Sequence, residues 1–200
     1  MNLLRFGNAY GGYVLDLDRI PSDGVVIDAG IGTDLSFADE LHKVRPALKF
    51  IGVDPGEESE EFVKKSKVEG WYTFISGAVV GDSRGSTVPL YLNAQPHHGS
   101  MTVYRSHRDA SRRMIEAKAI SLNELVCVYR PCVVKMDLEG AEYEVLAECF
   151  GVRQIALEFH EAMLGDEFKG RTDQAIRDLT AFGYSIDVRT EKDEVLAVLR

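Results

Sequence analysis

Long apolar runs are missing from this chain, and no stretch approaches the about 18 consecutive apolar residues of a membrane-spanning helix. The amino-terminal stretch MNLLRFGNAYGG also lacks the long apolar region of a secretory signal peptide. Basic residues are outnumbered, with 23 lysines and arginines against 32 aspartates and glutamates, and a net charge of −9 does not suit the phosphates of nucleic acid. These absences predict a cytoplasmic protein that binds neither a membrane nor nucleic acid.

Cysteine is also scarce. The three cysteines, Cys127, Cys132 and Cys149, are odd in number, lie in apolar surroundings and lack the spacing of a metal site. We therefore expect buried, reduced thiols rather than a disulfide scaffold. The sequence shows no internal repeat, linker or low-complexity tract, and 200 residues suffice for one sizeable core, so we expect a single domain over residues 1–200.

The central feature of the sequence is residues 25–37, VVIDAGIGTDLSF. A short β-branched run bounded by glycine is typical of a buried parallel strand. The apolar spacing that follows is typical of an amphipathic helix capped by Thr33 or Asp34. Between the two, Gly30 and Gly32 allow a tight turn and a close approach of the backbone to a ligand. The stretch predicts the first β-loop-α unit of a nucleotide-binding sheet.

The rest of the chain alternates between strand-like and helix-like segments. This predicts a doubly wound, Rossmann-like α/β fold with a mostly parallel seven-stranded sheet, helices on both faces and a C-terminal antiparallel hairpin. The expected strands include 49–54, 72–80, 86–92, 132–137 and 154–160, the expected helices 57–68, 139–150 and 172–182, and the hairpin 184–189 with 194–200. Residues 93–118 show no clear periodicity, and so long a stretch is usually functional, so we expect a substrate loop or lid there.

The dinucleotide-binding fingerprint G-x-G-x-x-G is missing, because Leu35 stands where its third glycine should be. Instead Asp28 precedes the two glycines, and Asp54 ends the next predicted strand. A carboxylate at the second strand end can accept hydrogen bonds from both ribose hydroxyls, and one ahead of the glycines suits a ligand with a positive end. This pair favours S-adenosylmethionine over NAD. A glycine turn in an α/β protein that binds neither is the alternative.

A second group of acidic residues lies at 133–144, VVKMDLEGAEYE. Asp137 falls at the end of a predicted strand, Glu139 opens a predicted helix, and His160 ends the next strand. In a doubly wound sheet these strand ends flank the point where ligands bind, so the three residues form a candidate acid–base cluster. The glutamates can also simply favour a helix N-terminus through its dipole. That reading does not account for Asp137 at a strand end with Lys135 inside an apolar strand.

Several motifs together point to one family. KMDLEGAEYEVL contains a D-x-E-G-x-E pattern that resembles the signature of the FkbM family of class I S-adenosylmethionine-dependent methyltransferases, and DAGIGTDLSF resembles the cofactor loop of that family. SGAVVGDSRGSTVPLYL, IALEFHE and YGGYVLDLDRIPSDGVVID are similar to further segments, so the likeness covers roughly residues 10–160. Asp34 departs from the pattern, since many members carry a third glycine there. The chain resembles the branch with a G-x-G-x-D-x-S-F loop.

The resemblance implies a cofactor site made of residues at strand ends and in the loops that follow. These residues are Asp28, Gly30, Gly32, Asp54, Gly77 and Ala78. The backbone at the two loop glycines would hold the methionine end of S-adenosylmethionine, with the first aspartate nearby. The aspartate after the second strand would hold the ribose, and residues 77–78 would line the adenine site.

The same resemblance implies that Asp137, Glu139 and His160 face the methyl group and its acceptor. A neutral hydroxyl is a poor nucleophile, so a base within hydrogen-bond reach helps its methylation. Either Glu139 or His160 can be that base, and the family signature favours Glu139. Asp137 would fix the acceptor or the ammonium group of the cofactor. We expect no metal, and Mg²⁺ held by oxygens of Asp137 and Glu139 is the alternative.

The implied function is methyl transfer from S-adenosylmethionine to a hydroxyl on a sugar or another small molecule. A domain that binds S-adenosylmethionine without catalysis and an NAD-dependent oxidoreductase are the alternatives on this architecture. Residues 93–118 would build the acceptor site, where His97 and His98 could touch substrate or simply be solvated. The sequence does not identify the acceptor or the oligomeric state.

Overall fold

The structure is a computed structural model that describes residues 1–81, 85–93, 101–105, 110–190 and 193–200. Its strands and α-helices, in chain order, are β1 (Leu3–Phe6), β2 (Tyr13–Asp16), β3 (Asp23–Ala29), α1 (Ser36–Val44), β4 (Ala47–Asp54), α2 (Glu57–Lys65), β5 (Tyr72–Ser76), β6 (Ala78–Val80), β7 (Thr87–Asn93), β8 (Met101–Thr102), β9 (Ala110–Ser121), α3 (Leu122–Tyr129), β10 (Val133–Met136), α4 (Glu142–Val145), β11 (Gln154–Glu158), α5 (Arg171–Phe182), β12 (Tyr184–Arg189) and β13 (Glu194–Leu199). Short 3-10 helices are η1 (Leu17–Arg19), η3 (Leu146–Cys149), η4 (Glu161–Met163) and η5 (Asp166–Phe168). Among the described helices, none is long and apolar enough to cross a membrane.

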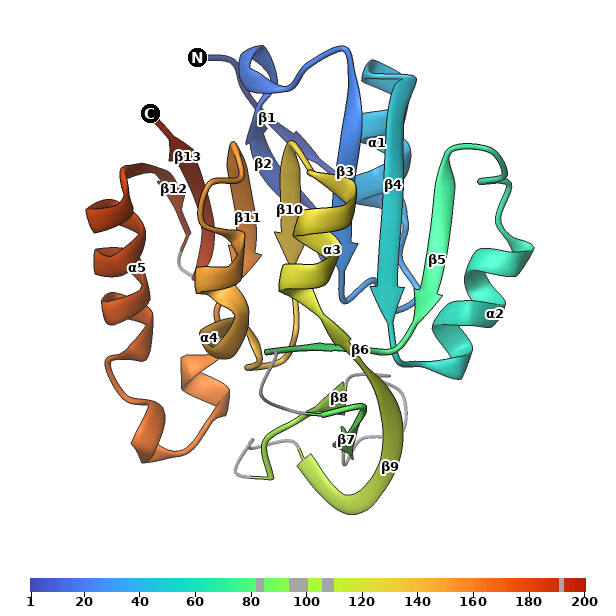
Figure 1. Cartoon of the computed structure of the whole chain (residues 1–200), viewed down its shortest axis with the longest axis vertical. Coiled ribbons are helices and arrows are strands. Elements are labelled where there is room, and N and C mark those ends of the chain that lie inside the picture. The colour runs from blue at the N-terminus through green and yellow to red at the C-terminus, as the bar shows by residue number, and fades with distance from the viewer. Residues whose placement is uncertain (82–84, 94–100, 106–109, 191–192) are drawn as a thin grey trace.

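The central sheet has seven strands in the order β12-β13-β11-β10-β3-β4-β5 (Figure 1). The strands from β11 to β5 run parallel to one another, whereas β13 runs antiparallel to both of its neighbours, β11 and β12. The sheet is therefore mixed, and the expectation of a mostly parallel sheet is corrected. The C-terminal hairpin is the reason, because its second strand inserts beside β11 and leaves β12 at the edge.

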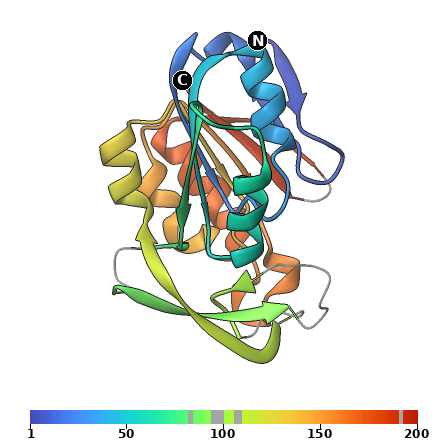
Figure 2. The same cartoon turned by 90° about the vertical axis from the view of Figure 1, so that its right-hand side faces the viewer.

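Helices cover both faces of this sheet. α1 and α2 pack on one face together with the small β1–β2 sheet, and α3, α4 and α5 pack on the other (Figures 1 and 2). Successive residues of a strand point to opposite faces, so Val26 of β3 joins one apolar cluster and Ile27 joins the other. Both side chains are fully buried. This two-sided core is what a doubly wound α/β fold requires.

The cysteines are free thiols, but they are not all buried. Cys149 is buried and Cys132 is half-buried, whereas Cys127 is exposed on the outer face of α3. The expectation of three buried thiols is therefore wrong for Cys127, because an apolar neighbourhood in sequence does not fix which face of a helix a residue takes.

A second, four-stranded sheet in the order β6-β9-β7-β8 includes part of the segment that appeared unpatterned. Residues 110–118 belong to the long strand β9, which pairs with β7 and β6, and residues 101–102 form β8. Residues 113–116 are all exposed, so neither face of the strand there is buried. The sequence therefore lacks the alternation of apolar and polar residues that indicates a half-buried strand. Residues 94–100, with His97 and His98, and residues 106–109 lie outside the described part of the chain.

The small sheet lies at the carboxyl ends of the parallel strands. The chain leaves β5 at Gly77 and enters β6, so the predicted strand 72–80 is divided between the two sheets. In Figures 1 and 2 the arrowheads of the parallel strands point toward β6–β9. Ligands of open α/β sheets bind at this edge, so the two sheets together define where a site should be.

Candidate active site

The loop after β3 packs directly against the end of β10. Gly30 has φ of +75°, and a Cβ on it would lie 1.7 Å from the carbonyl oxygen of Asp137. Its N–H donates to the carbonyl oxygen of Val53 at 2.9 Å. Only glycine permits this approach, because any side chain would collide with backbone. Gly32 differs, since a Cβ there would have no atom within 4 Å, so this part of the loop faces open space.

Asp54 fixes the glycine loop to the end of β4. One carboxylate oxygen accepts from the Gly32 N–H at 2.9 Å, and the other accepts from the Gly56 N–H at 2.8 Å and the Ser59 hydroxyl at 2.7 Å. The side chain is buried, with 6% of the residue exposed. The structure thus brings Asp54 and the glycine loop together, as the sequence predicted.

Helix α1 begins slightly later than expected. Its N-cap is Leu35, without a side-chain cap, and the first helical residue is Ser36. Asp34 still contributes, because its Oδ1 accepts from the Ser36 N–H at 2.8 Å. The prediction that Thr33 or Asp34 caps the helix is therefore corrected: the side chain of the residue just before the N-cap accepts a hydrogen bond from the first helical N–H.

Asp28 lies beneath the loop and has a cationic partner. Its Oδ1 is 3.3 Å from Lys135 Nζ, and its Oδ2 accepts from the Tyr72 hydroxyl at 3.3 Å. Lys135 also donates to the carbonyl oxygen of Gly30 at 2.6 Å. Burial raises the pKa of the Asp28 carboxyl, and the Lys135 charge opposes that rise. The pair therefore supports the loop from below, a role that sequence reasoning did not give to Lys135.

The three candidate catalytic residues converge at the ends of β10 and β11. His160 Nε2 lies 3.6 Å from Asp137 Oδ1 and 4.0 Å from Glu139 Oε2. Glu139 is not part of a helix, as had been expected, because α4 begins only at Glu142. It sits in a tight turn with φ of +51°, which few residues other than glycine adopt. Such strained positions are common at functional sites.

Glu142 organises this cluster, and the sequence analysis did not single it out. It is fully buried, and its carboxylate accepts from the Leu138 N–H at 2.7 Å and the Gly140 N–H at 2.8 Å. The same carboxylate is 2.9 Å from Nδ1 of His160 and fixes the ring. Its position as the last acid of the D-x-E-G-x-E pattern was the feature that could have identified it.

Carboxylates control the charge of His160. Burial lowers the pKa of the imidazole, but the three carboxylates around it, Glu142 foremost, raise it to about 10. The ring is therefore protonated at neutral pH. Glu158, at the end of β11, also has a raised pKa, because burial and the Asp137 charge raise it to about 7. Tyr13 donates to Asp137 Oδ2 at 3.1 Å and completes the surroundings of the cluster.

Gly77 and Ala78 connect the two sheets. The Gly77 N–H donates to the Asp54 carbonyl oxygen at 3.1 Å, and a Cβ on Gly77 would lie 2.5 Å from Ile120. The Ala78 side chain is buried in the apolar cluster of the small sheet. The predicted contribution of both residues to an adenine site therefore depends on their backbone, which lies next to the end of β4.

Residues 101–104 lie close to two of the loops that follow the carboxyl ends of the parallel strands. The terminal methyl carbon of Met101 lies 3.3 Å from where a Cβ of Gly56 would be, and the Thr102 hydroxyl donates to the carbonyl oxygen of Glu139 at 2.7 Å. Tyr104 bonds through its hydroxyl to the carboxylate of Glu144. This part of the predicted substrate loop thus touches the loops after β4 and β10.

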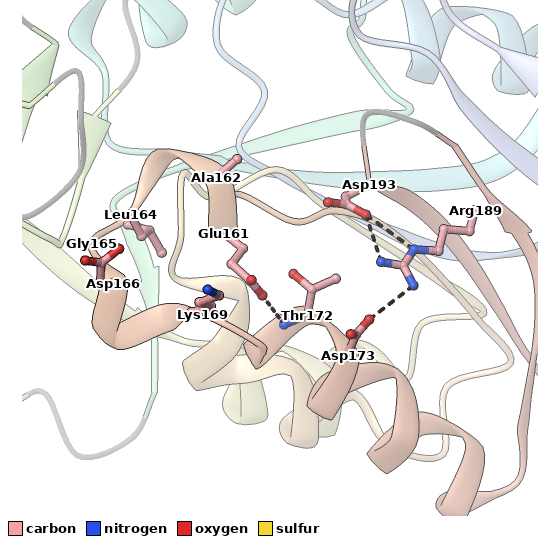
Figure 3. Close-up of a pocket in the computed structure, with 10 residues that line it drawn as sticks. All are labelled: Glu161, Ala162, Leu164, Gly165, Asp166, Lys169, Thr172, Asp173, Arg189 and Asp193. Carbon is pink, nitrogen blue, oxygen red and sulfur yellow. Dashed lines mark hydrogen bonds and ion pairs between the residues drawn. The ribbon is translucent and has the colours of Figure 1, made fainter.

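A polar pocket lies beyond His160, between the short helices η4 and η5, the start of α5 and the β12–β13 hairpin (Figure 3). Glu161 accepts from the Gly170 and Thr172 N–H groups, each at 2.8 Å. Across the pocket Arg189 pairs with Asp173 at 3.3 Å and with Asp193 at 3.2 Å. These charges are paired with one another and hold the wall of the pocket together.

The fold is similar to that of two solved structures. A precorrin-6y C5,15-methyltransferase from Geobacter metallireducens GS-15 aligns with a TM-score of 0.50 at 13% identity, over 91% of this chain and 84% of that chain. A fibrillarin/Nop5p complex aligns with a TM-score of 0.50 at 8% identity, over 90% of this chain and 74% of the other. At these identities the likeness is one of fold.

The model of the Methyltransferase FkbM domain matches residues 27–186, so the chain belongs to this family. This confirms the resemblance noted from its motifs and makes S-adenosylmethionine its cofactor. A search of the curated proteins found no match.

The residues at the strand ends fit such a cofactor. The space at Gly32 is open, with no atom within 4 Å of its Cβ position. Asp54 Oδ2 accepts one hydrogen bond from the protein, and a carboxylate oxygen has about two lone-pair sites, so it can accept another from a hydroxyl. Open backbone beside an anchored acid is what binding an adenosyl group requires.

Proposed function

We propose that the chain methylates a hydroxyl group of a sugar or another small molecule. The observation that supports this most directly is the convergence of Asp137, Glu139 and His160 at strand ends that abut the glycine loop. Acid–base groups beside a cofactor loop are the arrangement that transfer to a weak nucleophile needs.

The residues proposed to hold the cofactor keep the roles that the family resemblance implied. They are Asp28, Gly30, Gly32, Asp54, Gly77 and Ala78. The loop backbone would bind the methionine end, with Asp28 acting from beneath through its contact with Lys135. Asp54 would accept from the ribose hydroxyls. Gly77 and Ala78 would line the adenine with backbone.

We propose Glu139 as the base. Bound S-adenosylmethionine supplies an activated methyl group, so the chain itself must hold the acceptor in line and remove its proton. His160 carries a proton at neutral pH and cannot accept another, because neighbouring carboxylates raise its pKa to about 10. The Glu139 carboxylate is partly exposed, so an acceptor can reach it, and it lies 4.0 Å from His160 Nε2. Asp137 would fix the acceptor.

The partners and the location extend this proposal. Residues 93–118 would contribute to the acceptor site, because residues 101–104 touch the loop that carries Glu139. The acceptor would be a small hydroxylated molecule, and neither nucleic acid nor a membrane is expected as a partner. The cytoplasmic location stays a prediction.

Calorimetric titrations and a transfer assay test the function. We expect calorimetry to show binding of S-adenosylmethionine and of its demethylated product, and no binding of NAD, which the oxidoreductase alternative requires. Incubation with radiolabelled cofactor and a panel of hydroxylated acceptors should then show methyl transfer to oxygen. Cofactor binding without transfer to any acceptor would favour the non-catalytic binding domain, and transfer to nitrogen or carbon acceptors alone would contradict O-methylation.

A further inference from the structure

The side chains of Asp137, Glu139 and His160 converge without touching. His160 Nε2 is 3.6 Å from one carboxylate oxygen and 4.0 Å from the other, and one ligand atom from each residue lies within 4.8 Å of the others. These separations exceed hydrogen-bond lengths. Two ligands at about 2.1 Å from one ion are at most about 4.2 Å apart, and two at about 2.4 Å are at most about 4.8 Å apart. The spacing therefore fits three ligands around one cation.

His160 is presented as a metal-binding histidine usually is. The residue is 8% exposed, and Glu142 fixes its Nδ1 at 2.9 Å. Nε2 then points between Asp137 and Glu139, and it makes no hydrogen bond with the residues that the structure describes. Histidines that bind metals almost always give their other nitrogen to a carboxylate or carbonyl, which orients the ring and increases its basicity.

The charge of the site also favours a cation. The carboxylates of Asp137, Glu139 and Glu142 surround a single imidazole. A proton on Nε2 places one positive charge beside these carboxylates, and a divalent ion in its place would place two. Both Asp137 and Glu139 are partly exposed, with 29% and 24% of their side chains accessible, so an ion can reach them.

We propose that Asp137, Glu139 and His160 bind a divalent cation of the Mn²⁺ or Mg²⁺ class. Two carboxylates favour a hard ion, and an imidazole nitrogen favours Mn²⁺ among such ions. The proposal replaces the expectation of a metal-free site, and it adds His160 to the two ligands that the sequence had left as an alternative. Its catalytic consequence rests on the proposed function, since an acceptor oxygen bound to the ion would lose its proton more readily, and the Glu139 oxygen that does not bind the ion would accept that proton.

The direct test is Mn²⁺ binding to the full chain after treatment with EDTA and removal of the chelator. Electron paramagnetic resonance reports the loss of the free-ion signal, and we expect one saturable site per chain. Asp137→Asn, Glu139→Gln and His160→Gln should each weaken binding at least about 10-fold, and Glu142→Gln should weaken it by about 10- to 100-fold through the ring. Glu167→Gln, an exposed glutamate in η5, is the matched control and should bind as the wild type does.

No saturable site in the wild-type chain would overturn the proposal, as would wild-type binding by any of the three ligand variants. Circular dichroism and calorimetry with S-adenosylmethionine establish that each variant is folded. If His160→Gln does not fold, the partly exposed Glu139 carries the test. S-adenosylmethionine binding and methyl transfer in EDTA, without an Mn²⁺ site, would overturn the metal proposal alone. An Mn²⁺ site in a chain that transfers no methyl group would support it and contradict the proposed function.

Discussion

The two halves of the strand-end edge treat their carboxylates differently. At the ends of β3 and β4, Asp28 faces Lys135 and Tyr72, and Asp54 accepts from two backbone N–H groups and a serine hydroxyl. At the ends of β10 and β11, carboxylates instead surround one histidine. In the first half each carboxylate faces a cation or several hydrogen-bond donors, and we call it the satisfied half. In the second half three carboxylates lie around one histidine, and we call it the excess half.

The difference corresponds to what each half is proposed to bind. A buried acid with matched donors is a rigid part of the scaffold, and it holds the glycine loop in one position. Neighbouring carboxylates raise the pKa of His160, burial and the Asp137 charge raise that of Glu158, and groups with perturbed pKa values cluster at sites of chemistry. The satisfied half would thus be preorganised for the cofactor, while the excess half would be completed by a cation, a proton or an acceptor.

The largest expected effect comes from breaking the satisfied half. Lys135→Met removes the cation beside Asp28 and leaves a buried, uncompensated carboxylate. Breaking one partner of a buried pair costs about 3–5 kcal/mol, so we expect that loss in the free energy of unfolding measured with urea. Lys43→Met, at an exposed position of α1, is the control and should change stability by less than about 0.5 kcal/mol. Equal stability of the Lys135 and Lys43 variants would show that the pair does not support the loop.

A substitution in the excess half should lower the turnover of the enzyme rather than its stability. Glu139→Gln keeps the shape of the side chain but removes the proposed base, so we expect methyl transfer to fall by about 10²-fold or more. Affinity for S-adenosylmethionine, measured by calorimetry, should stay at the wild-type value because the satisfied half is unchanged. Glu167→Gln serves as the control again. Unchanged turnover would remove Glu139 from the mechanism.

The satisfied half was largely predictable because its determinants are local. A β-branched run, two glycines and an acid at each strand end are read directly from short stretches of sequence. What placed Asp28 opposite Lys135 is the register of β10 on β3, where the two residues are direct neighbours. Register between strands distant in the chain is not encoded in either strand alone, so Lys135 appeared only as a charged residue in an apolar strand.

The residues of the excess half were predicted from the sequence, but the local structure that holds them was not. Asp137, Glu139 and His160 came from a motif and from strand ends, and the structure brings them together. The turn at Glu139 was missed, because glutamates that favour a helix N-terminus look the same whether the helix begins at 139 or, as it does, at Glu142. The role of Glu142 depends on its burial, and burial was not expected because glutamates usually lie on the surface.

An intermediate effect is expected for substitution of Asp54. The experiment distinguishes a residue that only holds the glycine loop from one that also binds the ribose of the cofactor. Asp54→Asn keeps one acceptor but loses the charge that strengthens its hydrogen bonds, each worth about 1.5–3 kcal/mol to a charged group. We expect calorimetry to show about 10-fold weaker binding of S-adenosylmethionine. Turnover at saturating cofactor should change much less than in Glu139→Gln. Undiminished affinity would mean that Asp54 serves the loop and not the ribose.

The smallest effect is expected for Glu158, where the pH dependence of stability tests how the excess half differs from the satisfied half. Its pKa is raised from 4.5 to about 7, so the folded chain holds this proton more tightly than the unfolded chain, and stability falls as pH rises through that interval. Glu158→Gln mimics the protonated form and removes the loss. In buffer with EDTA we expect the variant to match the wild type near pH 4.5. Near pH 8 it should be about 1 kcal/mol more stable, allowing for partial exposure, or about 2–4 °C in Tm. A difference that does not grow with pH would show that the charge at the end of β11 is compensated, and the two halves would then differ less than their contacts indicate.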